Sequence, residues 1–313
     1  MERLRVIALQ KGVFLRSEAR DLGYDDKAVA RALRAKIWVR VRHGAYTFTD
    51  LWAAADALER HRIRTLAVLR SLHTRVAVSH TSAAVLHGLR LWNADLSRVH
   101  VTRLDGGAGR TERDLRHHEG LCLDDDLTEK DGVLLMNPTR AAVETSSLMD
   151  VEGAVVVLDS LLHSGLGTHD DIERVCAGME HWPETRHVRL ATRLADAGGH
   201  SVGESRTRHL CWVHGLPAPT TQFRVVDEAG VLVGITDLAW PEHGLLGEFD
   251  GKVKYGRLLS PGEDPTDVVF REKRREDRLR EATGYRVIRL TWADLSRGAE
   301  TAARIRRLML PAA

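Results

Sequence analysis

Two strand-like runs that carry acidic residues constrain this chain more than any other feature. The run ITDLAW contains Asp237, the pattern breaks over residues 241–244, and LLGEFDGK then carries Glu248, Asp250 and Lys252. Residues two apart on a strand share a face, so Glu248, Asp250 and Lys252 point the same way if the strand extends that far. Asp237 ends the neighbouring strand, which allows it to lie beside Glu248 across the pair.

Carboxylates that converge in a half-buried pocket repel one another unless a cation or a proton neutralises them. Oxygen ligands of this kind suit Mg²⁺ or Mn²⁺, and a nearby Lys can stabilise the charge that develops on a phosphate. Glu204, in the preceding helix, adds a further carboxylate. The residues therefore satisfy a metal-dependent phosphodiester-cleavage site. An edge strand with ordinary solvated charges is the alternative interpretation.

The surrounding residues predict an α/β sandwich over residues 196–313. A helix over 204–215 comes first, and a three-stranded meander follows it up to LLGEFDG. A highly charged helix over 267–283, a fourth strand within GYRVIRLTWADL and a closing helix complete the pattern. The glycines at 198 and 199 end the preceding helix, so we place a domain boundary near residue 196.

Residues 1–50 predict a winged helix-turn-helix DNA-binding domain. Two helical stretches end at Gly12 and Gly23, and Asp25 and Asp26 suit the start of a third helix. IWVRVRHGAYTF then alternates about a His-Gly turn, which is typical of a short hairpin. This segment carries eleven Lys and Arg against six Asp and Glu, so it is locally basic.

Basic side chains fall on both parts of this unit that could touch DNA. They are Lys27, Arg31 and Arg34 in the third helix, and Arg40 and Arg42 in the hairpin. The pattern favours a helix presented to the major groove with a wing on phosphate. The alternative is a small three-helix cap with a solvated basic face.

Residues 51–195 predict a mixed α/β connector domain. LWAAADALERHRIRTLAVLRSL has the periodicity of one long amphipathic helix, and RVAVSHTSAAVLHGL predicts a strand running into a helix. DGVLLMNPTRAAVETSSLM predicts a strand and a helix capped by Asn137, with Pro138 in its first turn.

Two pairs of histidines in this connector are candidate functional residues, and a metal role is considered for the first pair. His80 and His87 lie seven residues apart, and no third ligand has matching spacing, so we expect buried, hydrogen-bonded packing residues. His117 and His118 follow an arginine in a charged stretch, which predicts a solvated edge, with nucleic-acid contact as the lesser alternative.

Bulk properties exclude several classes of protein. A chain of 313 residues suggests two or three domains. Its formal net charge is only +2, so the charge of the whole chain does not by itself indicate a polyanionic partner such as a nucleic acid. The three cysteines, Cys122, Cys176 and Cys211, are far apart and form no CxxC, which fits a reducing cytoplasm. We find no apolar run of the roughly 18 residues that a membrane span needs.

The last third resembles the very-short-patch-repair-like endonuclease domains of the PD-(D/E)XK superfamily. The matching stretches are ESR at 204–206, GLPAPTTQ at 215–222, TDLAWPE at 236–242, EFDGK at 248–252, the Arg-rich helix at 271–280, and GYRVIRLTWADL at 284–295. The resemblance implies that Asp237 and Glu248 are metal ligands and that Glu204 completes or orients the site. The superfamily has Lys where this chain has Asp250. Strand parity favours Lys252 as the catalytic lysine, and Lys254 takes that role if the glycine at 251 bends the chain.

The N-terminal part, to about residue 160, resembles the AbiEi-type antitoxins of type IV toxin–antitoxin systems. The winged-helix pattern at 3–48, SHTSAAVLHGL at 79–89 and NPTRAAVETSSL at 137–148 carry this resemblance. It implies an N-terminal unit that binds DNA, commonly as a repressor.

The leading hypothesis is an Mg²⁺- or Mn²⁺-dependent DNA endonuclease. Asp237 and Glu248 would hold the ion, and Glu204, Asp250 and Lys252 would support the chemistry. Further phosphate contacts are expected from Lys254, Arg271, Arg274 and Arg275.

The alternative is a DNA-binding transcriptional regulator or antitoxin with an inactive nuclease fold. A third hypothesis adds selectivity for mismatched, damaged or modified DNA, in repair or defence. Duplex DNA is the expected partner, a double-strand cut would favour a homodimer, and the sequence identifies no toxin or repair partner.

Overall fold

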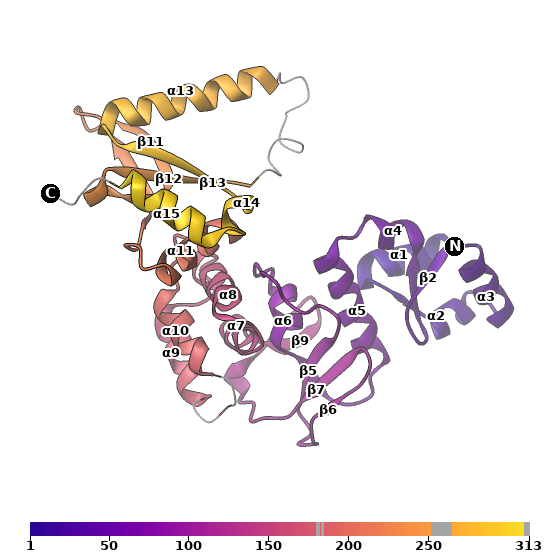
Figure 1. Ribbon diagram of the computed structural model, residues 1–313. Helices are drawn as coiled ribbons and strands as arrows, with labels where there is room; N and C mark the ends of the chain where they lie inside the picture. The colour runs from indigo at the N-terminus through magenta and orange to yellow at the C-terminus, as the bar shows by residue number, and fades with distance from the viewer. Residues whose placement is uncertain (180–181, 183–184, 252–264, 310–313) are drawn as a thin grey trace. The chain divides into compact units, whose positions relative to one another are not determined.

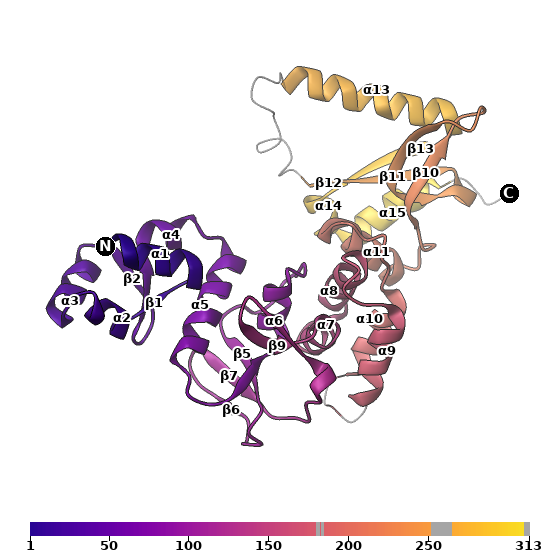
Figure 2. The same cartoon turned by 180° about the vertical axis from the view of Figure 1, so that it is seen from behind.

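The computed structural model describes residues 1–179, 182, 185–251 and 265–309, with the backbone alone for residues 265–272. The chain forms two compact units, which Figures 1 and 2 show from opposite sides. The first comprises Met1–Val157 and Leu166–Arg189, and the second comprises Leu158–Gly165 and Leu190–Ala313. The three domains expected from the sequence, 1–50, 51–195 and 196–313, stay a prediction.

The first unit begins with the predicted winged helix. Its elements are α1 (Glu2–Lys11), β1 (Phe14–Leu15), α2 (Arg16–Asp21), α3 (Asp26–Arg34), β2 (Trp38–Arg42) and β3 (Ala45–Phe48). The strands form a sheet in the order β1-β3-β2. Asp25 caps α3 by accepting a hydrogen bond from the backbone N–H of Ala28 (2.7 Å). Trp38 of the wing is buried edge-on against Phe14, with ring centroids 4.9 Å apart, so one small core holds helices and hairpin together.

A second, six-stranded sheet follows in the same unit, in the order β6-β7-β5-β4-β9-β8. Its strands are β4 (Val76–Val78), β5 (Val99–Arg103), β6 (Arg110–Thr111), β7 (Leu115–His118), β8 (Leu127–Lys130) and β9 (Val133–Met136), with a 3-10 turn η1 (Asp124–Asp126) before β8. The helices of this region are α4 (Thr49–Ala54), α5 (Ala57–Ser71), α6 (His80–His87), α7 (Pro138–Ser147), α8 (Val151–His163) and α9 (His169–Gly178). Hydrophobic side chains of α5 pack on β5 and β7, and those of α6 and α7 pack on β4 and β9.

The single long helix expected between residues 51 and 72 is wrong, because the structure has α4 and α5 there. Ala55 is extended, with φ −71° and ψ 132°, and Asp56 begins the second helix. The Asp56 carboxylate accepts a hydrogen bond from the backbone N–H of Glu59 (2.9 Å). A good N-cap residue within an amphipathic run can therefore divide the run, because the cap satisfies a backbone donor that a continuous helix would use internally.

The second unit is an α/β sandwich. Its sheet has the order β10-β11-β12-β13, in which β12 is parallel to β13 and the other pairs are antiparallel. The strands are β10 (Thr220–Val226), β11 (Leu232–Trp240), β12 (Leu245–Asp250) and β13 (Arg286–Thr291). The helices are α10 (Arg186–Leu194), which begins in the first unit, α11 (Val202–Val213), α13 (Pro265–Thr283), α14 (Trp292–Leu295) and α15 (Gly298–Leu308). The ribbon shows α13 on one side of the sheet and α15 with α11 on the other (Figure 1).

Two hydrophobic clusters account for this layering. Leu238, Trp240 and Phe249 pack with residues of α11, α14 and α15, whereas Leu246 packs with Leu279 of α13 on the opposite face. The break in the sequence between β11 and β12 is a 3-10 turn, η2 (Pro241–His243), followed by a glycine at 244 with φ 57°. This left-handed conformation suits glycine, and it returns the chain antiparallel to β11.

The predicted fold class is confirmed: the chain is a mixed α/β protein with a winged helix, a mixed α/β region and a C-terminal α/β sandwich. Among the described residues, no helix combines the length and the apolar composition needed to cross a membrane.

The packing of Gly203 gives a stability prediction. A Cβ at this position of α11 would lie 2.0 Å from the ring of Phe249, whereas a Cβ on Gly178 of α9 would meet no atom within 4 Å. We expect Gly203→Ala to lower the free energy of unfolding by about 1–3 kcal/mol through overpacking. Gly178→Ala should raise it by about 0.4–1 kcal/mol, because alanine reduces the entropy of the unfolded chain. Urea unfolding of both variants tests the packing; equal effects from the two would contradict it.

Candidate functional site

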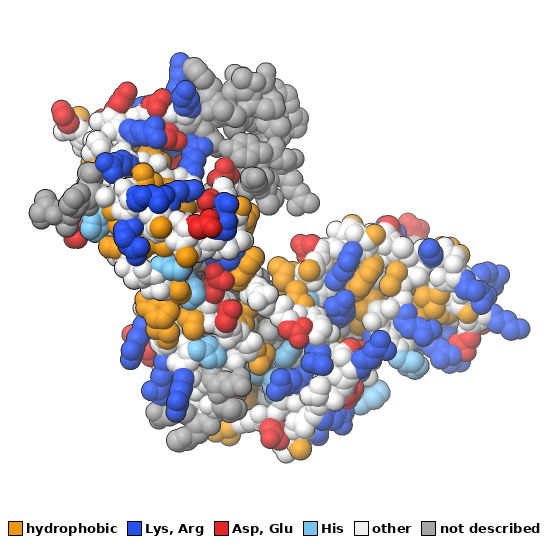
Figure 3. Space-filling model, in the orientation of Figure 1, with side chains coloured by type: hydrophobic (Ala, Val, Ile, Leu, Met, Phe, Trp, Pro, Cys, Tyr) orange, Lys and Arg blue, Asp and Glu red, His pale blue; other side chains and the backbone are white. Residues whose placement is uncertain are grey.

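One face of α3 presents the basic stripe that the sequence predicts. Lys27, Arg31 and Arg34 lie at positions i, i+4 and i+7 of the helix, and all three are exposed. The opposite face of α3 is anchored by the buried side chains of Val29 and Ala32. Figure 3 shows Lys and Arg side chains gathered at the α3 end of the winged helix. A rigid helix with its cations outward is the geometry that groove binding requires.

A groove runs between α3 and the β2–β3 hairpin. Its volume is about 390 Å³, and Arg34, Arg40, His43 and Arg16 contribute to its lining. Arg16 donates from Nε to Asp26 Oδ1 at 2.9 Å, so this arginine is already paired with a carboxylate. Arg34 of α3 and Arg40 of the hairpin are exposed on the two walls. The exposed face of α3 and the wing therefore share one basic surface.

Arg42 does not share that surface. Its guanidinium lies 3.5 Å from Glu112 Oε2 and 3.7 Å from Asp114 Oδ2, and its side chain is only 19% exposed. The register of the β2–β3 pair shifts between Arg40 and Arg42, and the Arg42 side chain joins the wing to the loop between β6 and β7. We therefore assign Arg42 a positioning role and leave it out of the basic surface.

Asp237 and Glu248 come together at the β11–β12 pair. Leu238 of β11 pairs with Gly247 of β12, and the two carboxylates are the next residues along their strands. Asp237 Oδ2 accepts a hydrogen bond from the backbone N–H of Phe249 at 2.9 Å, so it reaches across to the neighbouring strand. Burial raises the pKa of Glu248, and the charge of Asp237 raises it further. The adjacency that the sequence pattern predicts is thus present.

Arginines flank Glu248 from two elements. Arg275 Nη1 of α13 lies 3.1 Å from Glu248 Oε1, and Arg289 Nε of β13 lies 3.9 Å from Oε2. Both arginines lower the pKa of Glu248, against the larger effect of burial. Arg289 also pairs with Glu276 at 3.1 Å. The site is therefore a mixed cluster, in which arginine side chains already neutralise part of the carboxylate charge.

Glu204 has a structural role at the start of α11. Its Oε1 accepts from Ser201 Oγ (2.7 Å), and its Oε2 accepts from the backbone N–H of His200 and from Gln222 Nε2 (3.1 Å each). Ser201 in turn caps the helix by accepting from the backbone N–H of Glu204 (3.2 Å). These donors hold a buried carboxylate in place at the junction of α11 and β10.

Of the remaining residues predicted for the C-terminal site, the structure describes the side chains of two and not those of three. Asp250 is the last residue of β12, half-buried and paired in register with Thr291. Arg274 is exposed on α13. Lys252, Lys254 and the side chain of Arg271 lie outside the described residues.

Sequence reasoning missed a cluster of histidines in the first unit. Among the described residues, a set of three His, Cys, Asp or Glu side chains with ligand atoms within 4.8 Å of one another occurs at His80, His100 and His118. Asp237, Glu248, Asp250 and Glu204, all within the described part of the chain, form no such set. The expectation of a solvated edge at 117–118 is wrong for His117, which is 3% exposed, because β7 lies inside the six-stranded sheet. The only signal in the sequence was the histidine at 100 within the strand-like run SRVHVTRL.

The arginine–carboxylate cluster yields a double-mutant prediction. We expect Arg289→Met to destabilise the protein by about 1–3 kcal/mol, because it leaves the half-buried Glu248 beside Asp237 with less compensating charge. Combining it with Glu248→Gln should recover part of this loss, since the uncompensated charge is then absent. Arg286→Met, at an exposed position of the same strand, is the matched control. Strictly additive single effects in urea unfolding would contradict the coupling.

Comparison with known proteins gives a family match at the N-terminus. Two relatives are the uncharacterized proteins MT2308 and Rv2248 of Mycobacterium tuberculosis, strains CDC 1551 / Oshkosh and ATCC 25618 / H37Rv. Each is 27% identical over 259 residues, which covers 78% of this chain and 92% of the relative. A solved structure, the RV2827C protein from Mycobacterium tuberculosis, matches at a TM-score of 0.38 with 15% identity, over 60% of this chain and 76% of that one. Residues 2–49 match the family "Transcriptional regulator, AbiEi antitoxin", so the expected AbiEi-type resemblance is confirmed for the winged helix.

Proposed function

We propose that this chain is a DNA-binding transcriptional regulator of the AbiEi antitoxin type. The observation that carries the proposal is the exposed stripe of Lys27, Arg31 and Arg34 on α3, beside Arg40 of the hairpin. This basic surface lies entirely within the residues that match the family of transcriptional regulators. A family match and a surface of the right charge therefore coincide on one small folded segment.

Recognition by this surface follows from size and charge. The major groove of B-DNA is about 12 Å wide and admits an α-helix. With α3 in the groove, arginines of the stripe can donate two hydrogen bonds to guanine O6 and N7. Arg40 on the wing would meet the phosphate backbone, which positions the helix without reading sequence. Each neutralised phosphate releases counterions, so binding should weaken as salt rises.

Substitution of the exposed arginines tests this proposal. We expect Arg31→Ala and Arg40→Ala each to weaken binding to a duplex that spans the DNA upstream of its own coding sequence. The slope of log K against log salt should fall by about 0.9 for each lost phosphate contact. Arg174→Ala is the matched control, because Arg174 is 71% exposed on α9, away from the winged helix. Fluorescence anisotropy measures both quantities, and unchanged binding in the α3 and wing variants would overturn the proposal.

A second candidate function is metal-dependent cleavage of DNA by the C-terminal sandwich. The observation that favours it is the adjacency of Asp237 and Glu248, which the endonuclease resemblance requires. Glu248 Oε1 also fits a cation ligand: it is buried and accepts no hydrogen bond of good geometry within the described part of the chain, although Arg275 lies 3.1 Å away. Mg²⁺ or Mn²⁺ held there would act as a Lewis acid on the scissile phosphate.

The surrounding side chains define what the protein itself would contribute to cleavage. Asp237 and Glu248 would hold the ion, with Asp250 in support, while Glu204 keeps its structural role at the start of α11. Arg275 and Arg289 must then turn from Glu248 toward the phosphates, which exchanges an internal ion pair for a contact with substrate. Lys252, at a position outside the described residues, stays the proposed source of the catalytic lysine.

Cleavage assays separate the two functions. We expect the wild-type chain to nick plasmid DNA with Mn²⁺, and Asp237→Ala and Glu248→Ala to lose at least about 100-fold in rate, as removal of a charge-stabilising group does. Glu242→Ala, an exposed carboxylate in the turn between the same strands, is the control. Equal rates in all four proteins would remove the carboxylate site. Duplexes with mismatched or damaged bases, assayed in parallel, would show whether nicking is selective.

A further inference from the structure

Three histidines from separate elements converge on one face of the six-stranded sheet, at the start of α6. His80 is the first residue of α6, His100 lies on β5, and His118 is the last residue of β7. β5 and β7 are parallel, with Thr102 opposite His118, so the side chains of His100 and His118 share one face of the sheet. His100 Nδ1 and His118 Nε2 lie 2.9 Å apart, and the rings of His80 and His118 stack with centroids 3.7 Å apart.

The three imidazoles are held in the form that binds metal ions. Burial lowers the pKa of His100 to about 4 and that of His118 to about 3, and it lowers the pKa of His80 well below its ordinary value. All three rings are therefore neutral at pH 7, with a lone pair on one nitrogen of each. His80 also has φ 48°, a left-handed conformation that is uncommon for residues other than glycine and that recurs at functional sites.

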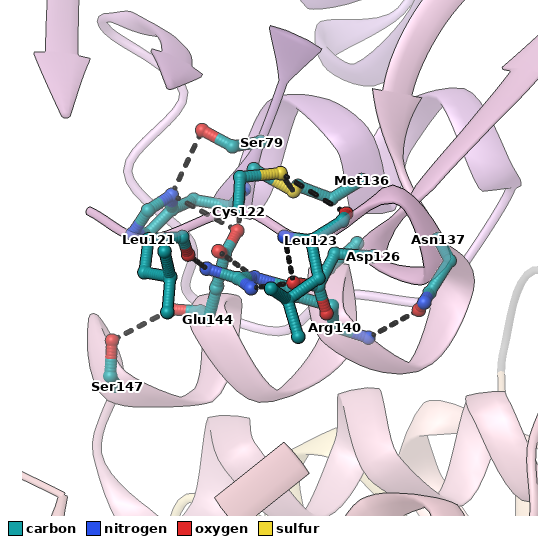
Figure 4. Close-up of polar contacts among 12 residues, drawn as sticks. Ser79, Leu121, Cys122, Leu123, Asp126, Met136, Asn137, Arg140, Glu144 and Ser147 are labelled. Carbon is teal, nitrogen blue, oxygen red and sulfur yellow. Dashed lines mark hydrogen bonds and ion pairs between the residues drawn. The ribbon is translucent and has the colours of Figure 1, made fainter. Parts of the chain in front are cut away.

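Glu144 supports His80 in the way that a carboxylate orients a metal-binding histidine. Glu144 Oε2 lies 3.3 Å from His80 Nδ1 and accepts the backbone N–H of the same residue at 3.1 Å. His80 Nδ1 also lies 3.0 Å from Ser79 Oγ. With its proton on Nδ1, directed to these oxygens, His80 presents Nε2 to a metal ion. Arg140 Nε donates to Glu144 Oε1 at 2.9 Å, and Arg140 also pairs with Asp126, as Figure 4 shows. This network connects the two connector motifs of the sequence, SHTSAAVLHGL and NPTRAAVETSSL, at the histidine cluster.

A pocket of about 880 Å³ opens beside the cluster. His80 and His118 form part of its wall, and Arg110, Arg116, Ser147 and Trp182 contribute to the remainder. The pocket gives an ion a route to the histidines. It also leaves room for a fourth ligand on the side of the cluster that the protein does not fill.

We propose that His80, His100 and His118 form a binding site for a late first-row divalent metal ion, such as Zn²⁺, with its fourth coordination position open to the pocket. Three imidazoles and one open position are a known zinc arrangement, and imidazole suits zinc, copper, iron and nickel. Zn–N bonds of about 2.0–2.1 Å in a tetrahedron place the nitrogens roughly 3.3 Å apart. The 2.9 Å separation of His100 Nδ1 and His118 Nε2 would therefore widen by a few tenths of an ångström as the ion replaces their hydrogen bond. The three rings, whose planes differ by 16° to 32°, would also rotate so that the ion lies in the plane of each ring.

Zinc titration of the full-length protein tests the site. We expect calorimetry to show one strong Zn²⁺ site, weakened by at least about 100-fold in His100→Gln and His118→Gln. Glu144→Gln should weaken it by about 10- to 100-fold, the usual effect of losing a carboxylate that orients a ligand. His87→Gln is the matched control, because His87 lies on the same helix and bonds to Met136 O at 2.8 Å, outside the cluster. Circular dichroism establishes that each variant is folded.

A second measurement keeps the test valid if a variant fails to fold. X-ray absorption at the zinc edge of the loaded wild-type protein should show three imidazole ligands. Weak binding to scattered surface histidines of the 16 in the chain would give a different spectrum and affinities insensitive to these substitutions. Either that result, or the absence of a stoichiometric site, would overturn the proposal.

Discussion

Burying a carboxylate is costly unless a cation and hydrogen-bond donors accompany it, and both units are organised around that requirement. In the first unit, the fully buried Glu144 forms an ion pair with Arg140 and accepts a hydrogen bond from the backbone N–H of His80. In the second, Glu248 lies between Asp237 on the next strand and Arg275 on α13. Contacts of this kind join elements that are far apart in the sequence. They add to the hydrophobic packing that places the helices on the sheets, and they bring ionisable groups from different elements together.

Local signals in the sequence were sufficient for the winged helix and for the strand pair that carries the carboxylates. Asp25 marks the start of α3 because its side chain can satisfy a free backbone donor. The break at 241–244 forces β11 and β12 into an antiparallel pair, and this brings Asp237 next to Glu248. The same reasoning failed between α4 and α5, where periodicity ran unbroken across an internal cap at Asp56.

Non-local pairing explains what the sequence could not predict. His100 and His118 meet because β5 and β7 are parallel neighbours, and nothing in either strand specifies that partner. The burial of His117 has the same origin. Arg275 reaches Glu248 only because α13 crosses that face of the sheet. Sequence spacing finds ligands on one element, whereas a site assembled from a helix start and two strands becomes visible only in three dimensions.

The shared aromatic core of the winged helix has a consequence for how it would engage DNA. Because Trp38 and Phe14 lock the hairpin to the helices, the distance between the arginines of α3 and that of the wing is set before any encounter. A preorganised footprint loses little conformational freedom on docking, so more of the contact energy would appear as affinity. A fixed spacing between these arginines also tolerates little variation in groove width. The local shape of the duplex would therefore contribute to the choice of binding site.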